Sequence, residues 1–217
     1  FLPNGQFGTR LLGGKDSASP RYICTALSPI TSHIFNPADF PLLEYLDDDG
    51  YKIEPRYYVP IIPMCLINGS QGIGTGYSTT IPNYNPIDII NIIMKKLNNE
   101  ELSELDHNIE PYYRNYKGKM TKRTKGKGYI SKGKYRFKNI TTLEITELPV
   151  GIWTEDYKEF LDSILVDTRK NREKVTVSSK QFLKNYQNYS TESEVRFVLK
   201  FTPTILNDLK TKKSSDK

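Results

Sequence analysis

The sequence predicts a mixed α+β protein, and three observations carry this prediction. A segment ending near residue 98 has the start signals and apolar content of a helix, whereas residues 127–148 and 194–201 alternate polar with apolar side chains, as antiparallel strands do. Prolines and glycines punctuate the remaining segments. The 217 residues suit one large domain or two small ones, and a boundary is predicted near residues 35–45.

The first third of the chain is predicted to be loop, then helix, then an extended segment. Residues 1–20 are rich in Gly, Ser and Pro, which favours loops with short extended pieces. The β-like residues 51–64 (YKIEPRYYVPIIPM) are interrupted by prolines. Pro29 predicts a kink or a break within a helix over residues 23–35. Apolar residues at helical spacing predict that helix: Ile23, Leu27, Ile30 and Ile34.

Three further helix starts are marked by capping residues and prolines. Asn85 can cap a helix that has Pro86 in its first position and Asp88 in its first turn, and this helix is predicted to run to about Asn98. Thr154 is predicted to cap a helix through about Leu165. Thr202-Pro203 is predicted to open a short helix, after which the tail 211–217 (TKKSSDK) frays.

Positive charge is concentrated in one segment. The net charge is +6, which modestly favours a polyanionic partner. Between Glu110 and Glu144 there is no acidic residue, and the segment 112–143 is densely basic. Two interpretations stay open, a solvated and partly disordered insertion or a track for DNA. If the segment touches DNA, binding should be independent of base sequence and strongly dependent on salt.

Other residue types exclude several classes of site and protein. Cys24 and Cys65 lack the spacing or the His partners of a zinc site, and a reducing compartment is the natural interpretation. His33 and His107 are isolated. No apolar run reaches the ~20 residues that span a bilayer. The chain begins without Met or a signal peptide, so we expect it to have been cut from a longer protein. An acidic run is expected to be a solvated turn rather than a metal site: Asp47, Asp48, Asp49 and Gly50.

The segment before residue 23 combines a nucleophile with phosphate-binding groups. Tyr22 follows Arg21, and tyrosine is a covalent nucleophile that must be activated. A neighbouring guanidinium favours the phenolate and can hold a phosphate under attack. Upstream side chains can also contact DNA: Gln6, Thr9, Arg10 and Lys15. Taken alone, this pattern is more often packing beside a surface charge.

The string GQFGTRLLGGKDSASPRY resembles the active-site segment of eukaryotic-type type IIA DNA topoisomerases over Gly5–Arg10, Gly13–Asp16 and Arg21–Tyr22. The resemblance implies that Tyr22 forms the 5′-phosphotyrosyl bond and that Arg21 stabilises the scissile phosphate. It places Gln6, Thr9, Arg10 and Lys15 in the DNA-facing part of a winged-helix domain.

A second motif, PIIPMCLINGSQGIGTGYSTTIPN, is similar to the same family and contains Ile73. The resemblance implies that Ile73 wedges between base pairs and bends the DNA. A dinucleotide-binding loop is rejected because Pro82, rather than a helix, soon follows GIGTG. Without the resemblance, an ordinary turn with Ile73 in a core would be favoured. The chain departs from the family pattern at a few positions, which puts details of packing and DNA contact in doubt: Gln71, Tyr77, Arg56-Tyr57 and Gly151-Ile152.

The resemblance also implies a domain order and a reaction. Residues 1–40 would end the winged-helix domain, and residues 41–217 would form part of a β-rich tower domain that includes the basic segment 112–143. The whole enzyme would be an isomerase that cuts both strands of double-stranded DNA as a homodimer in the nucleus. Mg²⁺ and ATP would bind outside this chain, which is therefore expected to be inactive alone and to hold no metal.

Three other interpretations stay open. The first is a bacterial-type gyrase or topoisomerase IV breakage subunit, which the GQFGTR, GGKD and GIGTG motifs disfavour. The second is a non-catalytic double-stranded DNA-binding module in which Tyr22 is structural. The third is a scaffold that kept the fold and lost the chemistry, against which the Arg21-Tyr22 pair and Ile73 speak. Covalent attachment of DNA at Tyr22 separates the catalytic from the non-catalytic interpretations.

Overall fold

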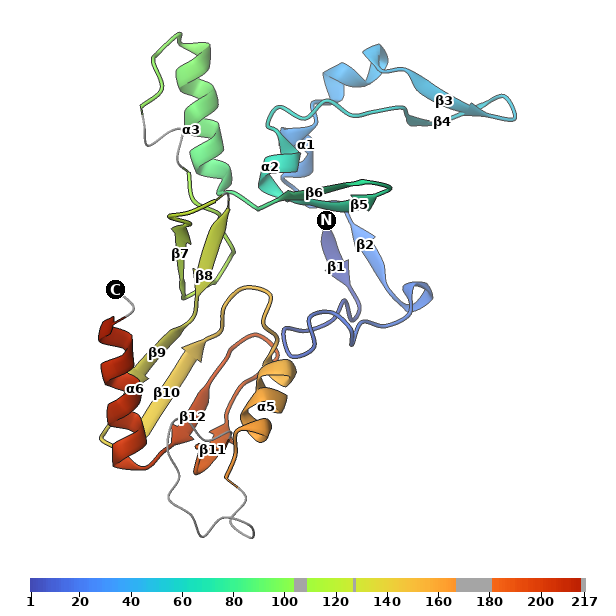
Figure 1. The fold of residues 1–217 in the computed structure, drawn as a ribbon. Coiled ribbons are helices and arrows are strands. Elements are labelled where there is room, and N and C mark those ends of the chain that lie inside the picture. The colour runs from blue at the N-terminus through green and yellow to red at the C-terminus, as the bar shows by residue number, and fades with distance from the viewer. Residues whose placement is uncertain (104–108, 127, 167–180, 216–217) are drawn as a thin grey trace. The chain divides into compact units, whose positions relative to one another are not determined.

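The computed structural model describes residues 1–103, 109–126, 128–166 and 181–215, and the chain divides into two compact units (Figure 1). Unit 1 comprises residues 1–3 and 25–115, and unit 2 comprises residues 4–24 and 116–217. These units follow a different division from the boundary expected near residue 40. The assignment of residues 1–40 and 41–217 to winged-helix and tower domains stays a prediction.

Unit 1 consists of short helices and two hairpins. The hairpin β3–β4 closes at the acidic run, where Asp49 and Gly50 both have positive φ and the Gly50 N–H donates to the Asp47 carboxylate at 3.0 Å. The predicted solvated turn is therefore confirmed. The elements of this unit are α1 (Thr31–Ile34), η2 (Pro37–Leu42), β3 (Tyr45–Asp48), β4 (Tyr51–Pro55), α2 (Met64–Ile67), β5 (Ser70–Gly74), β6 (Tyr77–Ile81) and α3 (Pro86–Leu97).

Helix α3 confirms the prediction made from its capping residues. The Asn85 side chain accepts a hydrogen bond from the Ile87 N–H at 3.0 Å, and Pro86 is the first helical residue. The helix ends at Leu97, with Lys95 and Lys96 in its last turn. Cap and helix signal lie within a few residues of one another, so local chemistry specifies this element.

The predicted helix over residues 23–35 is wrong. Its first part is the strand β2 (Cys24–Ala26), which pairs with β1 (Leu2–Asn4), and only Thr31–Ile34 is helical. Pro29 lacks an N–H and disfavours a helical conformation in the residue before it, so the helix begins only beyond it. The strand-like interpretation of PIIPM is also wrong, since β4 ends at Pro55 and Met64 begins α2.

Unit 2 is built on a four-stranded antiparallel sheet with the order β11-β12-β10-β9. Residues 127–148 and 194–201 supply strands, as predicted, and β7 pairs with β8 in a separate hairpin. The mixed α+β class with antiparallel strands is therefore confirmed. Its elements are η1 (Pro20–Tyr22), β7 (Lys119–Lys122), β8 (Tyr129–Lys132), β9 (Lys134–Phe137), β10 (Thr142–Glu147), α5 (Thr154–Ser163), β11 (Asn185–Asn188), β12 (Phe197–Lys200) and α6 (Pro203–Ser215).

The hydrophobic core of unit 2 lies on one face of this sheet, beneath α5 and α6 (Figure 1). Ile145 and Phe197 are Cα partners on β10 and β12, and the Tyr157 ring of α5 packs edge-on against Phe197 with ring centroids 5.3 Å apart. Ile205 and Leu206 anchor α6 to the same cluster. Burial of these apolar side chains is the main stabilising term available to the unit.

The opposite face of the sheet carries a buried carboxylate. Side chains alternate along a strand, so Glu144 projects away from the face that bears Ile145. The Glu144 side chain is 1% exposed and is paired with Arg136, with Lys138 at 3.1 Å and with Arg196 at 3.0 Å. These pairs offset the cost of burying the charge, and the hydrogen bond from Arg136 contributes most to lowering the pKa of Glu144 to about 2.

Two predicted helix termini are corrected. Trp153, not Thr154, occupies the N-cap of α5, because Thr154 is already the buried first residue of the helix, and its hydroxyl has no partner among the described residues. Helix α6 begins at Pro203, as predicted, but continues to Ser215 instead of fraying from residue 211. Residues 216–217, also predicted to fray, lie outside the described part of the chain.

Candidate active site

Residues 4–24 form a loop that closes on itself and carries the tyrosine singled out in the sequence. The Ala18 N–H donates to the Gln6 carbonyl at 2.9 Å. The Thr9 N–H and hydroxyl donate to the two carboxylate oxygens of Asp16 at 2.9 and 2.5 Å. These bonds lower the pKa of Asp16, because they stabilise the charged form. We call residues 4–24 the tyrosine loop.

Tyr22 ends a short 3₁₀ helix at one end of the tyrosine loop. Its N–H donates to the Ser19 carbonyl at 2.9 Å, and Pro20 provides the first helical residue. Gly5 has a positive φ of 106°, and a Cβ there would lie 2.8 Å from Ile23 Cγ2 and 3.2 Å from the Tyr22 carbonyl oxygen. Glycine is therefore required for the close approach that holds the two ends of the loop together.

The Tyr22 side chain is exposed and lies next to a guanidinium. It is 69% exposed, and Arg21 Cζ lies 4.9 Å from the centroid of its ring. A guanidinium over an aromatic face is a favourable arrangement. The structure therefore brings together the predicted nucleophile and the predicted phosphate-binding group, both at the surface of unit 2.

The far end of the tyrosine loop is docked on the sheet of unit 2. The Arg10 guanidinium pairs with the carboxylate of Glu147 at the end of β10, and the Arg10 N–H donates to the Glu192 carbonyl at 3.2 Å. The Leu11 carbonyl accepts from the Glu155 N–H at 3.1 Å. Gly13 lies so close to Trp153 that a Cβ would overlap the indole ring.

The four predicted DNA-contacting side chains of this loop differ in their surroundings. Gln6 and Lys15 are exposed, whereas Thr9 bonds to Asp16 and Arg10 is 26% exposed against Glu147. Sequence reasoning missed Asp16, Glu147 and Trp153 as partners of the loop. Glu147 lies within the string LEITELPVG, but nothing in the linear pattern joins that string to Arg10.

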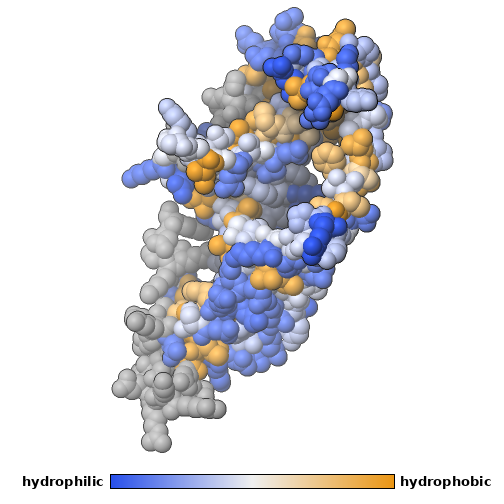
Figure 2. Space-filling model, turned by 90° about the vertical axis from the view of Figure 1, so that its right-hand side faces the viewer, coloured by the Kyte–Doolittle hydropathy of each residue, from blue (hydrophilic) through white to orange (hydrophobic). Residues whose placement is uncertain are grey.

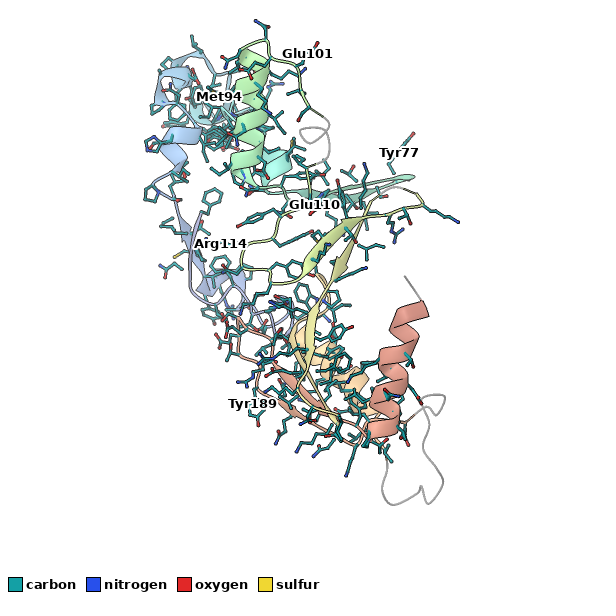
Figure 3. The ribbon with its side chains drawn as sticks, turned by 90° about the vertical axis from the view of Figure 1, so that its left-hand side faces the viewer. Tyr77, Met94, Glu101, Glu110, Arg114 and Tyr189 are labelled. Carbon is teal, nitrogen blue, oxygen red and sulfur yellow. The ribbon has the colours of Figure 1, made fainter. Side chains whose placement is uncertain are left out.

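Ile73 lies in a separate element, the β5–β6 hairpin of unit 1. Its side chain is 90% exposed, and its Cα partner is Ser78. An apolar side chain with this exposure contributes almost nothing to the hydrophobic core, so the interpretation of Ile73 as a core residue in an ordinary turn is wrong. Tyr77 is 85% exposed, and Figure 3 shows it at the tip of this hairpin with its side chain pointing away from the ribbon.

The basic segment 112–143 is structured where it is described. It contains β7, β8 and β9, so a largely disordered insertion does not fit this part of the chain. Lys127 lies outside the described residues. On the surface turned to the viewer in Figure 2, hydrophobic residues are interspersed among hydrophilic ones.

The described residues contain no group of three or more His, Cys, Asp or Glu side chains placed to hold a metal ion. Within the same residues, no helix is both long enough and apolar enough to cross a membrane. Cys24 and Cys65 are exposed free thiols.

The model of a family that comprises the A-type subunits of DNA gyrase and topoisomerase IV matches residues 1–216. DNA topoisomerase 2 of Drosophila melanogaster is 48% identical over 201 residues, which are 93% of this chain and 13% of the relative. The Pisum sativum DNA topoisomerase 2 is 54% identical over 162 residues, which are 75% of this chain and 11% of the relative.

A solved structure is similar along nearly the whole chain. The Plasmodium falciparum topoisomerase II DNA-binding, cleavage and re-ligation domain superposes with a TM-score of 0.82 at 42% identity, over 97% of this chain and 27% of that one. The chain thus spans a small part of the length of these relatives. The resemblance inferred from the motifs around Tyr22 and Ile73 is confirmed, and this chain belongs to the family of A-type DNA gyrase and topoisomerase IV subunits, in which it is similar to the eukaryotic DNA topoisomerase 2 proteins.

Proposed function

We propose that this chain is the DNA breakage–reunion part of an ATP-dependent type II DNA topoisomerase. The observation that carries the proposal is the exposed Arg21–Tyr22 pair, within a chain whose solved structural relative is named for cleaving and re-ligating DNA. In this assignment the tyrosine loop ends a winged-helix domain, and the sheet of unit 2 belongs to a tower domain.

The proposed chemistry is a transesterification at phosphorus. The Tyr22 oxygen forms a bond to a DNA phosphorus and loses its proton, while the phosphorus–oxygen bond to the neighbouring sugar breaks and the departing 3′ oxygen takes up a proton. Arg21 stabilises the negative charge on the phosphate oxygens as the transition state forms. The phosphotyrosyl ester retains the bond energy of the phosphodiester, so the reverse reaction reseals the strand without a further energy source.

The DNA contacts proposed for the chain fall into two groups. Gln6, Thr9 and Lys15 of the tyrosine loop, with Arg10 at its docked end, would face the sugar–phosphate backbone. Ile73 would insert between base pairs, where an apolar wedge unstacks one step for a few kcal/mol and bends the duplex. The 90% exposure of Ile73 supports this role, because an exposed branched apolar side chain at a hairpin is available to a partner.

The remaining requirements of the reaction would be met outside this chain. The described residues do not fit a Mg²⁺ ion, so no step of the reaction is assigned to a metal held by them. Mg²⁺ and ATP would bind elsewhere in the whole enzyme, which would act as a nuclear homodimer. We therefore expect the isolated chain to cleave no DNA.

Trapping of the covalent intermediate tests the proposal. The full-length protein and its Tyr22→Phe variant are incubated with supercoiled DNA and Mg²⁺, and protein-linked breaks are trapped with detergent. We expect linked breaks that disappear in Tyr22→Phe, because phenylalanine has no nucleophilic oxygen. Linkage that survives the substitution would show the catalytic assignment to be wrong. DNA binding without linkage in either protein would favour a non-catalytic DNA-binding module.

A further inference from the structure

The tyrosine loop behaves as a brace between two places in unit 2. At one end, Gly5 lies against the Tyr22 carbonyl and Ile23, and at the other, residues 10–13 contact the sheet and α5. Between these ends, the Gln6 carbonyl binds the Ala18 N–H, and Thr9 binds Asp16. A displacement of the docked end is therefore transmitted to the segment that carries Tyr22.

One buried carboxylate holds most of the docked end. The Glu147 side chain is 2% exposed, and its Oε1 accepts from the Arg10 guanidinium and from the Leu148 N–H at 2.9 Å. Its Oε2 accepts from the Lys117 N–H at 3.0 Å. Glu147 thus joins the tyrosine loop, the start of the basic segment and the end of β10.

The charge of Glu147 matters because both partners are largely withdrawn from water. A buried carboxylate is tolerated when donors satisfy its oxygens, and removing one member of such a pair leaves an uncompensated charge. Arg10 is the only side-chain cation that pairs with Glu147 among the described residues, and it belongs to the tyrosine loop. The fork of a guanidinium also fixes direction as well as distance.

We propose that Glu147 is a positioning residue for strand cleavage, which acts through Arg10 to hold the tyrosine loop and hence Tyr22 in register with the DNA phosphate. Neither Glu147 nor Arg10 needs to touch the reacting atoms. This inference rests on the proposed function, because it concerns how Tyr22 is presented for the same reaction.

The experiment uses the full-length enzyme with Glu147→Gln, Arg10→Met and the double variant. Glutamine keeps the size of the side chain and can still accept from Arg10 and Leu148, but its NH₂ group faces the Lys117 N–H and the charge is lost. Glu144→Gln is the matched control, because Glu144 is also buried and paired with cations but makes none of its ion pairs with the tyrosine loop.

We expect Glu147→Gln and Arg10→Met each to slow single-turnover cleavage at saturating DNA by about 10- to 100-fold, with DNA affinity changed far less, because misplacement of a reacting group by about 1 Å has an effect of this size. The double variant should cleave no more slowly than the slower single variant, since both substitutions break one linkage. Glu144→Gln should cleave at the rate of the unmodified enzyme even where its thermal stability falls.

Two results would overturn the inference. One is cleavage by Glu147→Gln at the rate of Glu144→Gln, and the other is multiplicative effects of the two single substitutions in the double variant. The unmodified enzyme and Tyr22→Phe run beside these variants. If the unmodified enzyme forms no Tyr22-linked breaks, the proposed function fails, and if it forms them while Glu147→Gln forms them equally fast, only the positioning role fails.

Discussion

The Arg21 guanidinium lies over the Tyr22 ring, with 4.9 Å between Cζ and the ring centroid. The two side chains that the reaction requires are therefore side by side before DNA is present. The guanidinium is held close to the place where a phosphate would meet the phenol oxygen, so this cation needs little rearrangement to stabilise developing charge.

Arg21→Lys should slow cleavage more than it weakens DNA binding. Lysine keeps the charge but lacks the planar, two-pronged contact to phosphate oxygens, and loss of one preorganised donor in a transition state costs about 10²- to 10³-fold in rate. Single-turnover cleavage and DNA affinity of the full-length enzyme measure the two effects separately. Equal rates for arginine and lysine would show that Arg21 supplies only general positive charge.

Ile73→Ala should reduce DNA bending and cleavage without destabilising the protein. Ile73 is 90% exposed, so the truncation should change the free energy of unfolding by no more than about 0.5 kcal/mol. Energy transfer between dyes at the two ends of a short duplex reports the bend. Thr79→Ala, at an exposed position of the same hairpin, is the control and should leave bending unchanged. A normal bend with alanine at residue 73 would exclude the wedge.

Gly13→Ala should lower the free energy of unfolding by about 1–3 kcal/mol, a range typical of residues forced into strained backbone conformations. Gly13 has a φ of 62°, and a Cβ there would overlap the Trp153 ring. Chemical denaturation measures the change. Gly72→Ala is the matched control, because nothing lies within 4 Å of its Cβ position, and its effect should be much smaller. Equal effects at the two positions would contradict the close packing of Gly13 on Trp153.

Glu144 should make stability depend on pH in the acid range. Pairing with the cations, above all the hydrogen bond from Arg136, outweighs burial and lowers the pKa of Glu144 from 4.5 to about 2. Because the folded-state pKa is the lower one, this stabilisation is complete above the unfolded-state pKa and is lost as the pH falls from there through the folded value.

Chemical denaturation as a function of pH checks this prediction. The difference in the free energy of unfolding between the unmodified protein and Glu144→Gln should be largest above about pH 5 and should shrink as the pH falls toward about 2. Other carboxyl groups with lowered pKa, such as Asp16, are present in both proteins and largely cancel in the difference. A difference that stays constant over this range would contradict the lowered pKa of Glu144.

Local sequence patterns predicted the elements whose signals lie within a few residues. Helix α3 follows from Asn85 and Pro86, and the β3–β4 turn follows from the acidic run and Gly50. The same approach failed for residues 23–35, where apolar residues at helical spacing belong to a strand and a short helix separated at Pro29. Periodicity records which side chains are apolar, whereas the pairing of β2 with β1 depends on a segment about twenty residues away in the chain.

The order of residue types along the chain was enough to indicate its chemistry, because Arg21, Tyr22 and Ile73 belong to contiguous motifs whose residue types carry the function. What holds Tyr22 in place became visible in the folded chain alone. Arg10 and Glu147 are 137 positions apart, and Gly13 and Trp153 are similarly distant. Such contacts arise when the chain folds back on itself, and a linear pattern of residue types contains no record of that path.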